Sequence, residues 1–97
     1  MTNELDQLFE TVHDRDSFLA FVAALAADRR TEVKEEKEHP SPPYGPGCRG
    51  WENGSIETFL EACVSCADDW GNRPEGLPTE PSWKDFARFL YSGKVYE

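Results

Sequence analysis

The sequence has few basic residues, and this shortage excludes two classes of partner. Ten lysine and arginine residues stand against nineteen aspartate and glutamate residues, which gives the 97-residue chain a formal net charge of −9. A protein that binds nucleic acid needs a basic face to displace counterions, and docking on anionic lipid needs one as well. We therefore expect no nucleic-acid partner and no membrane surface.

Long hydrophobic runs and paired cysteines are also missing. The longest apolar stretch, Phe18 to Ala27, is too short to cross a bilayer. Residues Met1 to Asp6 lack the basic region of a secretory signal peptide, and no apolar run follows them. Three cysteines, an odd number, do not suggest a disulfide framework. These absences predict a protein of the reducing cytoplasm.

The chain is long enough for one small domain, spanning residues 1–97. Three tryptophans, three tyrosines and six phenylalanines can supply most of a modest core. Proline and glycine concentrate at 39–50 and 71–81, and neither a helix nor a central strand tolerates that composition. We read both stretches as connecting loops.

The clearest element is an amphipathic helix between Trp51 and Trp70. Ser55 is the best candidate for its N-cap, with Asn53 as the alternative, and Gly71 suits the residue that ends it. The spacing places six residues on one face, which we expect to point into the core: Ile56, Phe59, Leu60, Cys63, Ala67 and Trp70.

Two further helices are predicted before this one. A short helix over 3–12 places Leu5, Leu8, Phe9 and Val12 on one side. A longer helix begins at the N-cap Asp14, and its core face is expected to hold Phe18, Phe21, Val22 and Leu25. Its opposite side is a strip of alanines, for which we favour an intramolecular neighbour: Ala20, Ala23, Ala24 and Ala27. The charged run from Arg29 to His39 is expected to continue the helix as a solvated tail that frays toward Glu38.

The last helix begins with a capping box formed by Ser82 and Asp85. Its inward face is expected to contain Trp83, Phe86, Ala87 and Leu90. We expect Gly93 to stop the helix, and Val95 and Tyr96 to pack back on the core. No segment alternates strictly enough to predict a strand. The fold class is therefore all-α: a small bundle of three principal helices plus a short N-terminal one, with the Pro/Gly-rich loop between the second and third helices.

Recognisable chemistry is scarce in this sequence. Cys63 and Cys66 could chelate a metal ion with Cys48 and either His39 or His13, which leaves a small Cys/His metalloprotein as the alternative hypothesis. Against it, Cys63 falls on the apolar face, where free cysteine behaves as a small hydrophobe. No nucleophile motif, phosphate loop or acid–base set is present, so we expect no catalytic residues, no enzymatic activity and no cofactor.

The remaining hypothesis is a protein-interaction module with a basic protein partner, because opposite charge favours association. The carboxylates of Glu57, Glu61 and Asp68 form a solvated stripe on the central helix. Tyr44 and Trp51 flank the second half of the Pro/Gly loop and complete the candidate partner-binding residues. The sequence does not predict an oligomeric state.

Several short motifs together resemble a family of small bacterial proteins of unknown function. Its members are similar in a D-x-F-x-x-F first helix, a W-E-N-x-[ST]-x-E-x-F-L-E-A central helix and a closing P-x-W…Y-E segment. The resemblance covers Asp14 to Glu97, apart from the variable stretches Glu32–Gly50 and Asn72–Thr79. It implies no activity. In size and charge such proteins look like toxin-neutralising (immunity) proteins, so an immunity-like or antitoxin-like role is one form of the interaction hypothesis.

Overall fold

The computed structural model describes residues 4–42, 47–70 and 78–96, except for the side chain of Trp70. Four helices follow one another along the chain: α1 (Glu4–Glu10), α2 (Arg15–Glu38), α3 (Ile56–Trp70) and α4 (Trp83–Val95). The described ranges contain no strand, which confirms the predicted all-α class. None of these helices combines the length and apolar character that crossing a membrane requires.

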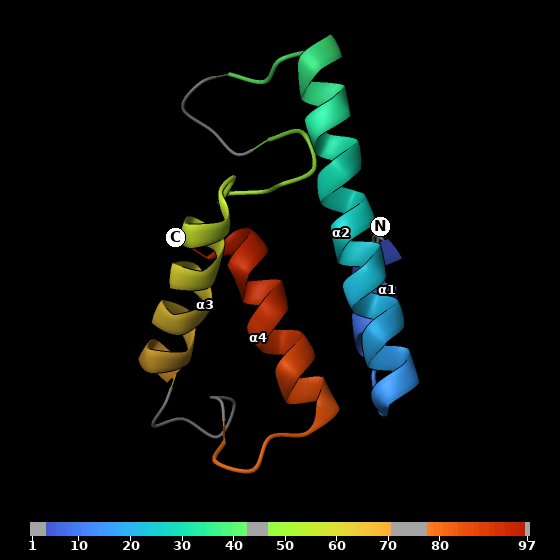
Figure 1. The fold of residues 1–97 in the computed structure, drawn as a ribbon, viewed down its shortest axis with the longest axis vertical. Coiled ribbons are helices and arrows are strands. Elements are labelled where there is room, and N and C mark those ends of the chain that lie inside the picture. Colours follow the sequence, from blue (N-terminus) through green and yellow to red (C-terminus); the bar gives the residue numbers. More distant parts are fainter. Residues whose placement is uncertain (1–3, 43–46, 71–77, 97) are drawn as a thin grey trace.

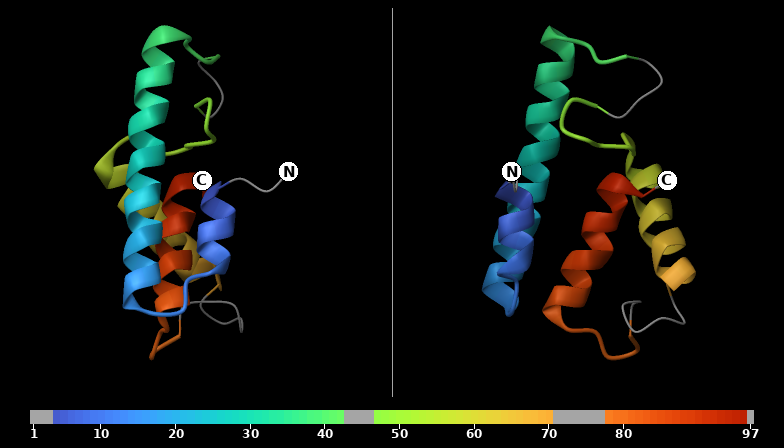
Figure 2. Two further views of the ribbon diagram at one scale, coloured as in Figure 1. Left: turned by 90° about the vertical axis from the view of Figure 1, so that its right-hand side faces the viewer. Right: turned by 180° about the vertical axis from the view of Figure 1, so that it is seen from behind.

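Helix α4 occupies the middle of the bundle (Figures 1 and 2). It packs most extensively against α3 on one side and also contacts α2 and α1 on the other, while α1 and α2 pack against each other. Helix α3 contacts α4 but neither α1 nor α2, so it forms one edge of the molecule (Figure 1). The C-terminal half of α2 extends beyond the bundle, and the described parts of the following loop lie beside it.

Side-chain caps start the three principal helices where the sequence predicts. Asp14 and Ser17 form a capping box at α2, and Ser82 and Asp85 form another at α4. The Ser55 hydroxyl accepts a hydrogen bond from the Thr58 backbone N–H at 3.2 Å at the start of α3. These bonds satisfy first-turn N–H groups that have no partner inside a helix.

The core is largely aromatic and joins α1, α2 and α4. Phe21 is fully buried, and its ring lies 5.8 Å from Phe9 and 5.3 Å from Tyr91, measured between centroids. The other buried members of this cluster are Leu5, Val12, Leu25, Trp51 and Ala87. The predicted inward face of the last helix is only partly correct, because Trp83 and Phe86 are about 40% exposed while packing on Phe18.

The face of α3 that we expected to enter the core is rotated in the structure. Ala62, Cys63 and Cys66 are buried and Phe59 is half-buried, whereas Ile56 is 79% and Leu60 51% exposed. The helix is apolar on two adjacent strips, and periodicity alone does not decide which strip meets α4. The expectation of a buried Cys63 is confirmed, and that of a buried Ile56 and Leu60 is wrong.

Gly93 decides how α4 meets α3. We expected this glycine to end the last helix, but it is buried inside α4, which continues to Val95. A Cβ here would lie 2.6 Å from the Phe59 ring and 2.7 Å from the Cys63 sulfur, so the glycine allows a close helix crossing. Val95 is 54% exposed and does not pack back as expected.

Two expectations for α2 also fail. Of the alanine strip only Ala24 packs against the core, while Ala20, Ala23 and Ala27 are exposed, so the expected neighbour covers just one edge of the strip. The charged run is not a fraying tail, since α2 is helical through Glu38 and Glu32 is only 1% exposed. Its carboxylates accept hydrogen bonds from the loop that follows, which supplies the anchoring that a purely solvated helix would lack.

Candidate functional site

The carboxylates of α2 bind the loop that leads to α3. Asp28, Glu32 and Glu36 recur every fourth residue and therefore share one face of the helix. Glu36 accepts hydrogen bonds from the hydroxyl and backbone N–H of Ser41 and from the backbone N–H of Cys48. These bonds lower the pKa of Glu36, with the Ser41 hydroxyl contributing most.

Glu32 is the buried member of this row. Its carboxylate accepts the backbone N–H groups of Arg49 at 3.0 Å and Trp51 at 3.2 Å, and the Arg29 guanidinium at 2.6 Å. Gly47 also lies against it, and a Cβ at that position would collide with the carboxylate. A buried charge is tolerable when its hydrogen bonds are satisfied, as they are here.

Asp28 joins α2 to α4 and to the loop. Its carboxylate accepts hydrogen bonds from Lys94 at 2.9 Å, from the Trp51 indole at 2.9 Å and from Arg49 at 3.2 Å. Burial opposes ionisation of Asp28, but the bonds from Lys94 and Trp51 outweigh burial and hold the pKa of the carboxyl below its usual value. Lys94 is only 4% exposed, so the pair is enclosed.

The tripeptide Trp51-Glu52-Asn53 connects this polar centre to the end of α4. The Trp51 ring stacks on Phe59, while the charged ends of Arg29 and Lys94 each lie 5.7 Å from its centroid. The backbone N–H of Glu52 bonds to the Lys94 carbonyl at 2.8 Å. The Asn53 side chain donates to two carbonyls at the C-terminal end of the helix, those of Gly93 at 2.9 Å and Tyr96 at 2.8 Å.

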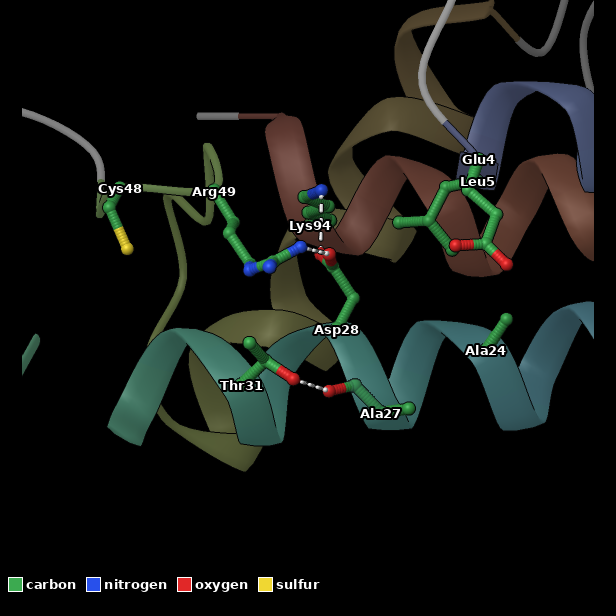
Figure 3. A pocket seen from close by; sticks show the side chains of 9 residues that line it. All are labelled: Glu4, Leu5, Ala24, Ala27, Asp28, Thr31, Cys48, Arg49 and Lys94. Carbon is green, nitrogen blue, oxygen red and sulfur yellow. Dashed lines mark hydrogen bonds and ion pairs between the residues drawn. The ribbon is translucent and has the colours of Figure 1, made fainter. Parts of the chain in front are cut away.

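A polar pocket of about 570 Å³ opens beside Asp28, and Figure 3 shows Arg49 and Lys94 converging on its carboxylate. The other lining residues are Glu4, Leu5, Ala24, Ala27, Thr31 and Cys48. Arg49 also pairs with Glu35 at 3.1 Å, and Thr31 bonds to the Ala27 carbonyl. Because both cations already have carboxylate partners, we interpret this centre as structural.

A second pocket, of about 610 Å³ and mainly apolar, lies between α1, α3 and α4. Phe9, Tyr91, Val95 and Tyr96 are among its lining residues. Two of its polar groups already have partners, because the Tyr91 hydroxyl donates to the Asp6 carboxylate and Arg88 pairs with Asp85 at 3.1 Å. The Tyr91 bond fixes α1 to α4.

The structure places the predicted metal ligands in separate regions. Cys63 and Cys66 are buried in the α3–α4 contact, where burial raises the pKa of both thiols, whereas Cys48 lies exposed on the loop and His39 caps α2. Within the described ranges, the group of ligand atoms close enough to share an ion consists of Glu32, Glu36 and Cys48.

Hydrogen bonding gives this group another explanation. The two carboxylates hold the loop, and the Cys48 thiol donates to Glu35 at 3.2 Å. This bond is the main cause that raises the pKa of Cys48 to about 11, which makes the thiolate form, the one that binds metal ions, harder to reach.

The predicted partner-binding residues also separate. Glu57, Glu61 and Asp68 are exposed, and none of their side chains makes an ion pair or hydrogen bond with another described residue. Trp51 is 8% exposed and engaged on all sides, so it is unavailable to a partner, and Tyr44 lies outside the described residues. Of the predicted partner-binding residues, the three that are described and exposed therefore all lie on α3.

Sequence reasoning missed Asp28, Glu32, Arg49 and Lys94 as an internal polar centre. The available signal was the four-residue spacing of the α2 carboxylates, followed by a loop whose N–H groups need acceptors.

The sequence does contain a known pattern. The model of a family of unknown function (DUF7660) matches residues 14–97, whereas no curated protein and no solved structure matches the chain.

Proposed function

The chain belongs to this family of unknown function, and we propose that it is a protein-interaction module that binds a basic protein through the exposed carboxylates of α3. The observation that carries the proposal is the charge of this helix. Helix α3 contains Glu57, Glu61, Asp68 and Asp69 and no lysine or arginine. An acidic face of this kind attracts a basic partner and accelerates its association.

The internal polar centre supports the same proposal by contrast. Helix α2 also carries several carboxylates, but these make hydrogen bonds or ion pairs with the loop, with Lys94 and with arginines. On α3 the carboxylates have no such partners among the described residues, so their charge faces outward. The acidic side chains of the two helices thus have different tasks: one set holds the fold together, and the other is open to another molecule.

A toxin-neutralising role is one specific form of this proposal. It would make the partner a basic toxin, and its support is the small size and the net charge of −9. We propose no catalytic activity for the chain. We place it in the cytoplasm, which suits three cysteines that remain free thiols.

The proposal is tested by affinity capture from a lysate of the source organism with elution by increasing salt. The bait is the intact chain, and a variant removes the α3 charges with Glu57→Gln, Glu61→Gln and Asp68→Asn. A matched control, Glu10→Gln, Asp16→Asn and Glu38→Gln, removes the same number of charges from exposed positions on α1 and α2.

We expect the wild type and the matched control to retain one identified basic protein, released as salt screens the charges, and the α3 variant to lose it. Equal capture by all three baits, or equal loss in both variants, would contradict a site on α3. Binding that resists salt would contradict the electrostatic basis.

A further inference from the structure

The exposed face of α3 carries an apolar stripe beside its carboxylates. Ile56, Leu60 and Val64 recur every fourth residue and are 79%, 51% and 53% exposed. They lie between the strip buried against α4 and the acidic row of Glu57, Glu61 and Asp68, hereafter the acidic row. A solvated helix normally carries polar residues at such positions, so three branched apolar side chains in line indicate a covered surface.

The fold does not cover this stripe within its described part. Among the helices α3 contacts only α4, and that contact uses the adjacent strip, with Cys63 at Gly93 and Cys66 at Ser92. Figure 1 shows α3 at the edge of the bundle, and the view from behind in Figure 2 also places it outermost. Within the described residues the stripe is therefore open and can receive another molecule.

We infer that this occupant is an amphipathic helix of a partner protein, with apolar residues against Ile56, Leu60 and Val64 and lysines or arginines along one flank against the acidic row. This inference rests on the proposed function and specifies the partner's structure. A straight row at four-residue spacing matches the ridges of a second helix. Helix α3 has 15 residues, so it can accompany a partner of about four turns.

Charge makes a second copy of the chain a poorer occupant of the stripe than a basic helix. Each copy has a net charge of −9. Pairing two α3 helices antiparallel about a two-fold axis would bring both acidic rows to the same side of the contact, and a parallel pair would still join two strongly acidic chains, so like charges repel in either case. A basic amphipathic helix would instead bury the apolar stripe and pair with the acidic row at the same time, as amphipathic helices do when they bind an apolar surface of a partner.

The probe is a fluorescein-labelled synthetic peptide of about four turns with leucines at helical spacing and lysines along one flank. A scrambled peptide of the same composition keeps the charge but has no apolar face. Binding of each to the intact chain is followed by fluorescence anisotropy. Leu60→Ser removes part of the stripe, and Leu19→Ser is the matched control, since Leu19 is an exposed leucine of α2 at 45%.

We expect the wild type to bind the amphipathic peptide roughly tenfold more tightly than the scrambled one, because burial of leucine side chains contributes only in the first case. Leu60→Ser should remove about tenfold of that affinity, and Leu19→Ser should leave it unchanged. Circular dichroism of both variants establishes that the helices are intact.

The possible failures are distinguishable. Equal binding of both peptides, insensitive to Leu60→Ser but weakened by Glu61→Gln, would overturn the helical partner and leave the proposed function standing. No binding of either peptide would overturn both. Concentration-dependent dimerisation in sedimentation, abolished by Leu60→Ser, would assign the stripe to a second copy and overturn the inference.

Discussion

The carboxylate of Glu32 accepts the backbone N–H of Trp51 at 3.2 Å, across nineteen positions of sequence. Glu32 is 1% and Trp51 8% exposed, so this bond lies in the interior. The bond holds the loop against α2 at Trp51. The next two residues, Glu52 and Asn53, donate hydrogen bonds to carbonyls at the end of α4. The W-E-N tripeptide is therefore a joint between helices, and it leaves the outer face of α3 open.

Replacing Glu32 by alanine should destabilise the protein more than any change at an exposed glutamate. Two backbone N–H groups and the Arg29 guanidinium lose their acceptor. We expect the free energy of unfolding, measured in urea, to fall by about 2–4 kcal/mol. The matched control Glu38→Ala, at an exposed position on the same helix, should change it by less than about 0.5 kcal/mol. A similar loss in both variants would show that Glu32 is not the anchor.

Gly93→Ala should also destabilise, although alanine favours helices over glycine by about 1 kcal/mol. The added Cβ would meet Phe59 and Cys63 within 2.8 Å, and overpacking of this kind costs about 1–3 kcal/mol. We expect a net loss in thermal and urea stability. The double variant with Cys63→Ala should recover part of it, since one colliding atom is gone. Strictly additive losses would mean that the two residues do not share this contact.

Acid should loosen the loop from α2. Hydrogen bonds lower the pKa values of Glu35 and Glu36 in the folded protein, led by Cys48 for Glu35 and by Ser41 for Glu36. Their stabilisation is thus complete above the unfolded-state pKa of about 4.3 and is lost as the pH falls through the lower folded-state values. Urea unfolding between neutral pH and pH of about 3 should show a shallower decline for Glu36→Gln than for wild type. Glu38→Gln, with the same charge change, should follow wild type; coinciding curves for all three would refute the assignment.

Cys48 should react slowly despite its exposure. Its thiol donates to Glu35, and that bond with nearby carboxylates raises the thiol pKa to about 11. Because the thiolate is the nucleophile, alkylation by iodoacetamide at mildly alkaline pH should be roughly a hundredfold slower than for an unperturbed cysteine. Mass spectrometry of the Cys48 peptide over time gives the rate, and Glu35→Gln should increase it. Fast alkylation that ignores Glu35→Gln would show that the bond is absent in solution.

Local sequence signals predicted the helices well. The caps at Asp14, Ser55 and Ser82 act within a single turn, so their residues can be recognised without the rest of the fold. Phe21 and Cys63 were also placed correctly in the interior. The W-E-N and closing motifs indicate a family of unknown function, and the family model that matches residues 14–97 confirms membership of such a family.

Tertiary pairing accounts for what the sequence did not predict. The sequence from Arg29 to His39 looks like a solvated stretch when it is considered alone. Its carboxylates accept hydrogen bonds from Ser41, Arg49 and Trp51, which a local window does not contain. Gly93 resembles a helix stop until Phe59 and Cys63 are seen against it. The orientation of α3 depends in the same way on which strip meets α4, and this choice leaves Ile56 and Leu60 outside.

The most direct measurement of the central claim is a nitrogen–proton NMR titration of the intact chain with the basic amphipathic peptide. The account predicts shifts at the backbone amides of Glu57, Leu60, Glu61 and Val64, while the indole N–H of Trp51, bonded to Asp28, keeps its position. Shifts confined to other helices, or a moving Trp51 indole signal with α3 unchanged, would contradict a binding face on α3 supported by a rigid joint.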